Sequence, residues 1–162
     1  MLLVHALITS RESRLDYANA LFYGLPAKFL RKLLRVQNVA ARIVTGTRRT
    51  AHITPVLKSL HWLPLHQRIA FKLCLLVHKC IHGSAPAYLA ELLTLRTNNC
   101  DLRSNGTFLL DVPRVTSAMS QRAFGVAGPQ VWNTLPMDLR NKPDTTIFKR
   151  KLKTLLFIQA FN

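Results

Sequence analysis

The feature that most constrains this chain is a stretch of 74 residues, 17–90, that contains no acidic side chain. Eleven cationic side chains lie in that stretch without a local counter-ion, whereas an ordinary protein surface mixes both signs of charge. They are Lys28, Arg31, Lys32, Arg35, Arg42, Arg48, Arg49, Lys58, Arg68, Lys72 and Lys79. Any fold of this stretch leaves a surplus of positive charge, for which an external polyanion is the natural neutraliser.

The whole chain repeats this imbalance, with 23 Lys and Arg against 7 Asp and Glu in 162 residues and a formal net charge of +16. That charge favours nucleic acid or an anionic membrane surface as a partner. It argues against an acidic enzyme with a small-molecule substrate and against a receptor for basic ligands. The length and the 49% of hydrophobic residues suit one ordinary domain with a core, and they argue against a disordered tail.

The N-terminal sequence MLLVHALITS has neither a basic leader region nor a cleavage site, so no signal peptide is expected. The longest membrane-span candidate, 69–81, is interrupted by Lys72, His78 and Lys79. The three cysteines show no disulfide framework spacing and are expected to be reduced thiols. These features predict an intracellular protein, nuclear or cytoplasmic, that is not secreted and has no membrane partner.

Helical signals dominate the first 94 residues, and turn residues such as Gly24, Gly46 and Gly83 separate them. The expected helices are 13–23, 27–45, 54–60, about 65–82 and about 86–94. On a helical wheel for 27–45, five cations fall within an arc of about 100°. They are Lys28, Arg31, Lys32, Arg35 and Arg42, and Arg48 and Arg49 follow in the next loop. The opposite half holds Phe29, Leu30, Leu33, Leu34, Val36, Ala40, Ile43 and Val44.

The pattern changes after residue 95, where a polar segment, 95–107, precedes a short expected strand at 108–112. Residues 123–132 are interrupted by Gly125, Gly128 and Pro129, which predicts a strand with a turn or an irregular packed segment. Asp144 is expected to cap a final helix, 145–158.

That final helix carries four cations in its first turns, where the helix dipole disfavours them and an external anion would help. They are Lys149, Arg150, Lys151 and Lys153. The predicted fold is mainly α, a bundle of about five helices followed by a short irregular β-containing segment and a C-terminal helix. We expect a basic bundle at 1–94, with 95–162 packed on it as one unit.

The sequence offers no recognisable catalytic centre, because its one close carboxylate pair, Glu12 and Asp16, is flanked by Arg11 and Arg14 and suits ion pairing. It contains no nucleophile elbow and no glycine-rich phosphate loop. We therefore expect no catalytic residue and no cofactor.

A zinc site is the alternative use of one helix face, where Cys74, His78 and His82 recur at intervals of four with Cys80 nearby. The spacing matches no familiar zinc finger, so core or surface roles are favoured and no metal site is expected. Trp62 and Trp132 could stack on a nucleic-acid base, but anchoring a turn against the core is the favoured interpretation.

Several strings resemble, in the same order, the segment that follows the polymerase thumb in LINE-type (non-LTR) retrotransposon reverse transcriptases. They are VHALITSRESRLDYANALFYGLP, LRKLLRVQNVAARIVTGTRR, HITPVLKSLHWLPLHQRIAFKLCLLVHKCIHGSAPAYLAELL, RAFGVAGPQVWNTLP and FKRKLKTLLF. The resemblance covers nearly the whole chain and is greatest to the Jockey-like and LINE-2-like branch. It departs near Glu12, where three residues are additional, and at Ala18, which replaces a cysteine. Three residues rotate a helix by about 300°, which would disturb its register.

The resemblance implies that the parent protein carries an endonuclease and an RNA-directed DNA polymerase, whose catalytic motifs are absent here. It implies a non-catalytic segment that contacts template RNA or target DNA and, through its position, the upstream polymerase domains. The contacts would go to phosphates from the two basic sets, 28–49 and 149–153. Two alternatives stay open: a transposon relic that needs the missing thumb to fold, and a basic amphipathic protein on an anionic membrane.

Overall fold

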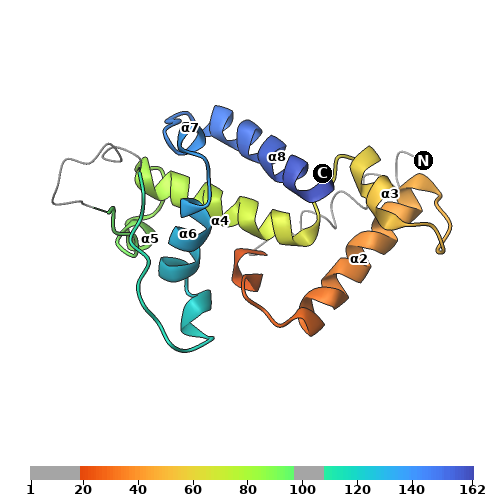
Figure 1. Cartoon of the computed structure of the whole chain (residues 1–162), viewed down its shortest axis with the longest axis horizontal. Coiled ribbons are helices and arrows are strands. Elements are labelled where there is room, and N and C mark those ends of the chain that lie inside the picture. Colours follow the sequence, from red (N-terminus) through yellow and green to blue (C-terminus); the bar gives the residue numbers. More distant parts are fainter. Residues whose placement is uncertain (1–18, 97–107) are drawn as a thin grey trace. The chain divides into compact units, whose positions relative to one another are not determined.

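The computed structural model describes residues 19–96 and 108–162, and these are mainly helical, as predicted (Figure 1). The elements are η1 (Asn19–Phe22), α2 (Ala27–Thr45), α3 (Ile53–Ser59), α4 (Leu65–Ile81), α5 (Ala87–Ala90), η2 (Ser120–Arg122), α6 (Phe124–Asn133), α7 (Met137–Arg140) and α8 (Thr145–Phe161). The described residues fall into two compact units, one taken from Met1–Ile69 and Leu155–Asn162 and the other from Ala70–Thr154. The expected boundary between 94 and 95 stays a prediction.

Helix α2 organises the first unit and matches its predicted range, Ala27–Thr45. It ends at Gly46, whose left-handed backbone (φ 66°) donates its N–H to the carbonyl of Arg42. The helix buries Leu30, Gln37 and Ala41, which recur at helical spacing on one face. The buried Gln37 side chain donates from Nε2 to the carbonyl of Leu63 at 2.8 Å. This bond ties α2 to the loop between α3 and α4.

The core of the second unit is built around Trp132 and Phe148, both fully buried, with their ring centroids 5.7 Å apart. The indole Nε1 of Trp132 donates to the carbonyl of Phe108 at 2.6 Å. Trp132 thus has the anchoring position that was favoured over base stacking. Trp62, in the first unit, is half-buried.

Residues 123–132 were predicted as a strand with a turn or an irregular segment, and this is wrong: Phe124–Asn133 forms helix α6. Gly128 permits close packing, because a Cβ atom there would lie 3.0 Å from Cγ2 of Val77 on α4. A Cβ atom at Gly125 would lie 3.0 Å from the carbonyl oxygen of Leu92. The glycines, which predict chain breaks in the sequence, instead allow neighbouring segments to pack closely against the helix. The buried Pro129 lies within the helix.

The strand expected at 108–112 is reduced to an isolated antiparallel bridge between Leu95 and Leu110, and no other strand pairing occurs in 19–96 and 108–162. On the other side of Leu110, the side chain of Asn133 takes the place of a second strand. Its Oδ1 accepts from the Leu110 N–H at 3.0 Å, and its Nδ2 donates to the Leu110 carbonyl at 2.8 Å. The β pairing therefore ends after one residue.

The ends of other helices follow the expected signals with small differences. Asp144 caps α8 as predicted, because its Oδ1 accepts from the N–H of Ile147 at 2.8 Å. Helix α5 covers only Ala87–Ala90 of the expected 86–94. The helix expected at 13–23 lies partly outside the described residues, and its described part is the short 3₁₀ helix η1.

Replacing Asn133 by Ala should destabilise the protein by about 2 kcal/mol, because it leaves the N–H and C=O of the buried Leu110 without partners. Urea denaturation measures this loss in the free energy of unfolding. The exposed Asn141 offers a matched control, and Asn141→Ala should change that free energy by less than about 0.5 kcal/mol. Equal effects of the two variants would contradict the bridging role of Asn133.

Candidate nucleic-acid interface

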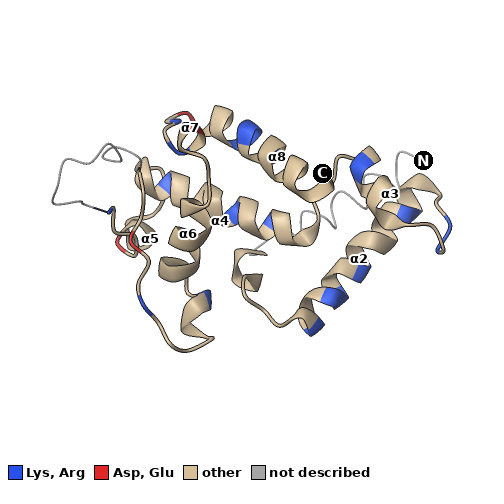
Figure 2. Ribbon diagram, in the orientation of Figure 1, with Lys and Arg blue, Asp and Glu red and all other residues tan. Residues whose placement is uncertain are grey.

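The first basic set lies along α2 and the loop that comes after it (Figure 2). Lys28, Arg31, Lys32 and Arg35 are exposed, Arg42 is half-buried, and Arg48 and Arg49 are exposed. Six of these seven cations are thus exposed, and their role in binding stays a prediction. We use the name α2 stripe for Lys28, Arg31, Lys32, Arg35, Arg42, Arg48 and Arg49.

The second basic set lies on α8, in the other compact unit. Its members are all exposed: Lys149, Arg150, Lys151 and Lys153. Phe148 and Leu152 bury the opposite face of the same helix segment. The two basic sets therefore belong to different compact units.

The α2 stripe has no acidic side chain to neutralise it within the described part of its own unit. Residues 19–69 and 155–162 contain neither Asp nor Glu. The exposed pair of Arg96 and Asp111, 4.0 Å apart, lies in the other unit. Within the described part of this unit, no acidic side chain offsets the positive charge of the stripe, which therefore favours a bound anion.

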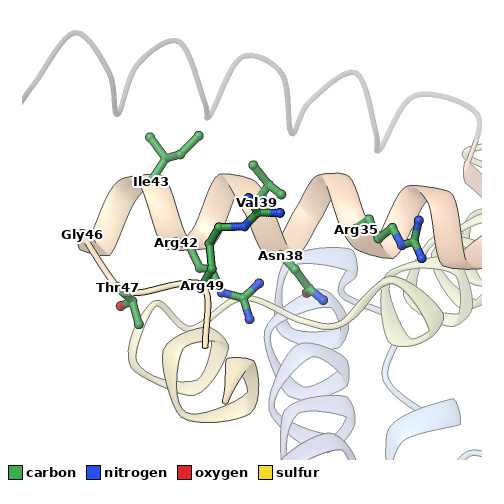
Figure 3. Close-up of a pocket in the computed structure, with 8 residues that line it drawn as sticks. All are labelled: Arg35, Asn38, Val39, Arg42, Ile43, Gly46, Thr47 and Arg49. Carbon is green, nitrogen blue, oxygen red and sulfur yellow. The ribbon is translucent and has the colours of Figure 1, made fainter. Parts of the chain in front are cut away.

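Part of the stripe borders a hollow of about 900 Å³ beside the C-terminal half of α2 (Figure 3). It is lined by Arg35, Asn38, Val39, Arg42, Ile43, Gly46, Thr47 and Arg49. Figure 3 shows Arg42 and Arg49 near the C-terminal end of α2 and Arg35 farther along the same helix. Three arginine residues therefore line this hollow together with amide, hydroxyl and aliphatic side chains.

The hollow exists because the chain turns back at Gly46 and is held against α2. The N–H of Thr47 donates to the carbonyl of Arg42 at 3.1 Å, and Nη2 of Arg42 donates to the carbonyl of Ala51 at 3.1 Å. Arg42 thus fastens the loop that carries Arg49. The Nε of Arg42 and the Oδ1 of Asn38 are buried and make no hydrogen bond within the described chain.

The helical wheel places Phe29, Val36 and Ile43 with Leu30 in the apolar half of α2, but the structure buries Leu30 and leaves the other three exposed. Val36, Val39 and Ile43 are 54%, 53% and 58% exposed, and Phe29 is 47% exposed. The sequence carries a signal for part of this face, because Val39 is four residues after Arg35 and three before Arg42. Val39 must therefore lie between these cations, and not on the buried side of the helix.

Cys74, His78 and Cys80 of α4 are buried and have core roles. Burial raises the pKa of the Cys74 thiol to about 12, and burial also raises the pKa of Cys80. The fully buried His78 ring stacks on Phe148 with centroids 4.2 Å apart, and its Nε2 lies 2.8 Å from the carbonyl of Lys142. A carbonyl accepts only, so Nε2 carries the proton. Within 19–96 and 108–162, no group of three or more His, Cys, Asp or Glu could hold a metal ion.

Comparisons with known proteins give no relative for this chain. No protein-family model matches it, and no curated protein or solved structure shows significant similarity. In the part of the chain that the structure describes, no helix is long and apolar enough to cross a membrane. The resemblance to LINE-type reverse transcriptases therefore stays a prediction from the sequence strings.

The buried His78 should make stability depend on pH. Burial lowers its pKa below the usual 6.5, and the positive charge of His82 adds to this, although the Lys142 carbonyl and Asp144 oppose it. Below pH 6.5 the unfolded chain binds a proton that the folded chain excludes. The free energy of unfolding should therefore be greatest above pH 6.5 and fall by about 1.4 kcal/mol per pH unit until the folded pKa is reached.

Urea denaturation at pH 7.5, 6.5 and 5.5 measures this dependence, with His78→Gln compared against His66→Gln at an exposed position. His78→Gln should remove most of the decrease, because glutamine can donate to the Lys142 carbonyl but does not titrate. A decrease of equal size in both variants would show that other groups cause it.

Proposed function

We propose that this chain is a non-catalytic nucleic-acid-binding segment, and that it belongs to the region after the polymerase thumb of a LINE-type reverse transcriptase. Its partner is template RNA or target DNA, contacted mainly at phosphates by the α2 stripe. The exposed cations of α8, 149–153, supply a second contact set. The family part of the proposal rests on the ordered sequence strings, and the binding part rests on the charges.

One observation carries the binding proposal: the described part of the first unit has no Asp or Glu, while most cations of α2 and the loop after it are exposed. Seven cations on one helix and its loop would repel one another in a protein that binds nothing. Guanidinium groups also suit phosphate, because their planar donors can bind two oxygens at once. Arg35, Arg42 and Arg49 share one hollow, which supports phosphate as the ligand.

An anionic membrane surface is a second candidate, favoured by the exposed Phe29, Val36, Val39 and Ile43 beside the cations. Helices that lie in a membrane interface usually present large Trp, Phe and Leu side chains. Here three of the four exposed apolar residues are the short β-branched Val and Ile, and α2 also buries a separate face at Leu30 and Ala41. Nucleic acid is the better supported partner.

Binding should fall steeply with salt. Fluorescence titration of the full chain with a single-stranded RNA 20-mer and a DNA duplex 20-mer, at 50 and 200 mM salt, measures this. Five to seven phosphate contacts predict a loss in affinity of about 100- to 1,000-fold for the single strand over that range. Absence of binding to either nucleic acid at 50 mM salt would overturn the proposal.

Two further measurements separate the alternatives. Vesicles that contain anionic lipid should bind more weakly than RNA at equal salt; binding to vesicles alone would favour a membrane surface. A cooperative thermal unfolding transition is expected, whereas a relic that needs the polymerase thumb to fold would aggregate without one.

The charge-reversed variant Arg31→Glu with Arg35→Glu should weaken nucleic-acid binding without unfolding the protein, because both side chains are exposed. Lys58→Glu with Arg114→Glu is the matched control, since it changes the net charge equally at exposed positions outside both basic sets. At 50 mM salt the stripe variant should lose at least about tenfold more affinity than the control. Equal losses would show that only net charge matters, and loss of folding would contradict the exposed position of the stripe.

A further inference from the structure

The hollow beside α2 has two kinds of wall that a phosphate group alone would not use together. Near the C-terminal end of α2, Arg42 and Arg49 supply cationic hydrogen-bond donors to the hollow. Val39 and Ile43 supply an aliphatic surface. We infer that this hollow receives one unpaired nucleotide of a single-stranded nucleic acid, with its phosphate on the arginines and its base against Val39 and Ile43. The inference rests on the proposed function and adds the form of the ligand.

The phosphate side is organised before any ligand arrives. Arg42 is half-buried, and its bond from Nη2 to the carbonyl of Ala51 restricts the guanidinium and holds the 46–51 loop. Because Arg49 lies in that loop, both cations are positioned by the same fold. The restricted guanidinium of Arg42 loses less side-chain freedom on binding phosphate than a free surface arginine would, and the held loop places Arg49 beside it.

The apolar side points to an unpaired base. Val39 and Ile43 are four residues apart, so they lie one turn apart on the same face of α2, and both are more than half exposed. In a duplex the base faces are stacked inside, and the outer surface is mostly charged backbone. In a single strand the faces of the bases are available for apolar contact.

The size of the hollow agrees with this ligand. A volume of about 900 Å³ is near the upper end for pockets that enclose small organic ligands and is far more than one phosphate needs. Inorganic phosphate would leave the aliphatic wall uncovered. A nucleotide covers both walls, and the charge of the arginines matches its phosphate.

A test compares three probes that carry the same number of phosphates per strand: oligothymidylate of twelve nucleotides, an abasic single strand of the same length, and a twelve-base-pair duplex. The full chain should bind the oligothymidylate about five- to tenfold more tightly than the abasic strand. The two single strands should show the same salt slope, because they release the same counter-ions. The duplex should bind more weakly per strand than the oligothymidylate.

The variant Val39→Ser with Ile43→Ser should reduce binding of the oligothymidylate to that of the abasic strand, while binding of the abasic strand stays unchanged. Phe29→Ser with Val36→Ser is the matched control, since it removes two exposed apolar side chains of the same helix that do not line the hollow. The control should keep the preference for bases. Thermal unfolding of each variant checks that it is folded, and the comparison of probes on the unaltered chain stands without the variants.

The outcomes separate this inference from the proposed function. Equal affinity for the oligothymidylate and the abasic strand, with a steep salt slope, would overturn the nucleotide site and leave phosphate binding by the stripe. Loss of the preference in the control variant would also overturn it. Absence of binding to all three probes would overturn the proposed function itself.

Discussion

The mutual repulsion of the cations in the first unit is the constraint on which its surface depends. Two like charges about 10 Å apart repel by roughly 1.7 kcal/mol at an effective dielectric constant of about 20, and by about a quarter of that in water. No Asp or Glu among the described residues of that unit offsets this cost, and exposure to water reduces it. Accordingly, α2 buries only the uncharged Leu30, Gln37 and Ala41 and leaves its cations in solvent or at the edge of the hollow.

Local signals predicted the elements that depend on neighbouring residues. The range of α2 follows from its apolar spacing and from Gly46, and the start of α8 follows from the Asp144 cap. Helix α6 could not be predicted in this way, because a glycine weakens an isolated helix but also permits close contact with a neighbour. At Gly128 the close contact with Val77 on α4 favours a helix that contains glycine. That contact forms only in the tertiary structure, so the local sequence does not show it.

The candidate site, too, could be predicted from local sequence only in part. A helical wheel places Arg31 and Arg35 on one side of α2, since their positions depend only on the helix. The hollow could not be predicted, because it requires the loop after Gly46 to return to the helix and Arg42 to reach the carbonyl of Ala51. The returning loop places Arg49 near Val39 and Ile43, so that charged and apolar side chains line one hollow.

Backbone amide NMR shifts of the full chain, followed during titration with a single-stranded RNA 12-mer at low salt, test the central claim most directly. The account predicts that the largest shift changes cluster on residues 27–51, with smaller changes at 149–153. Changes of equal size spread over the second unit, or no changes at saturating RNA, would contradict it.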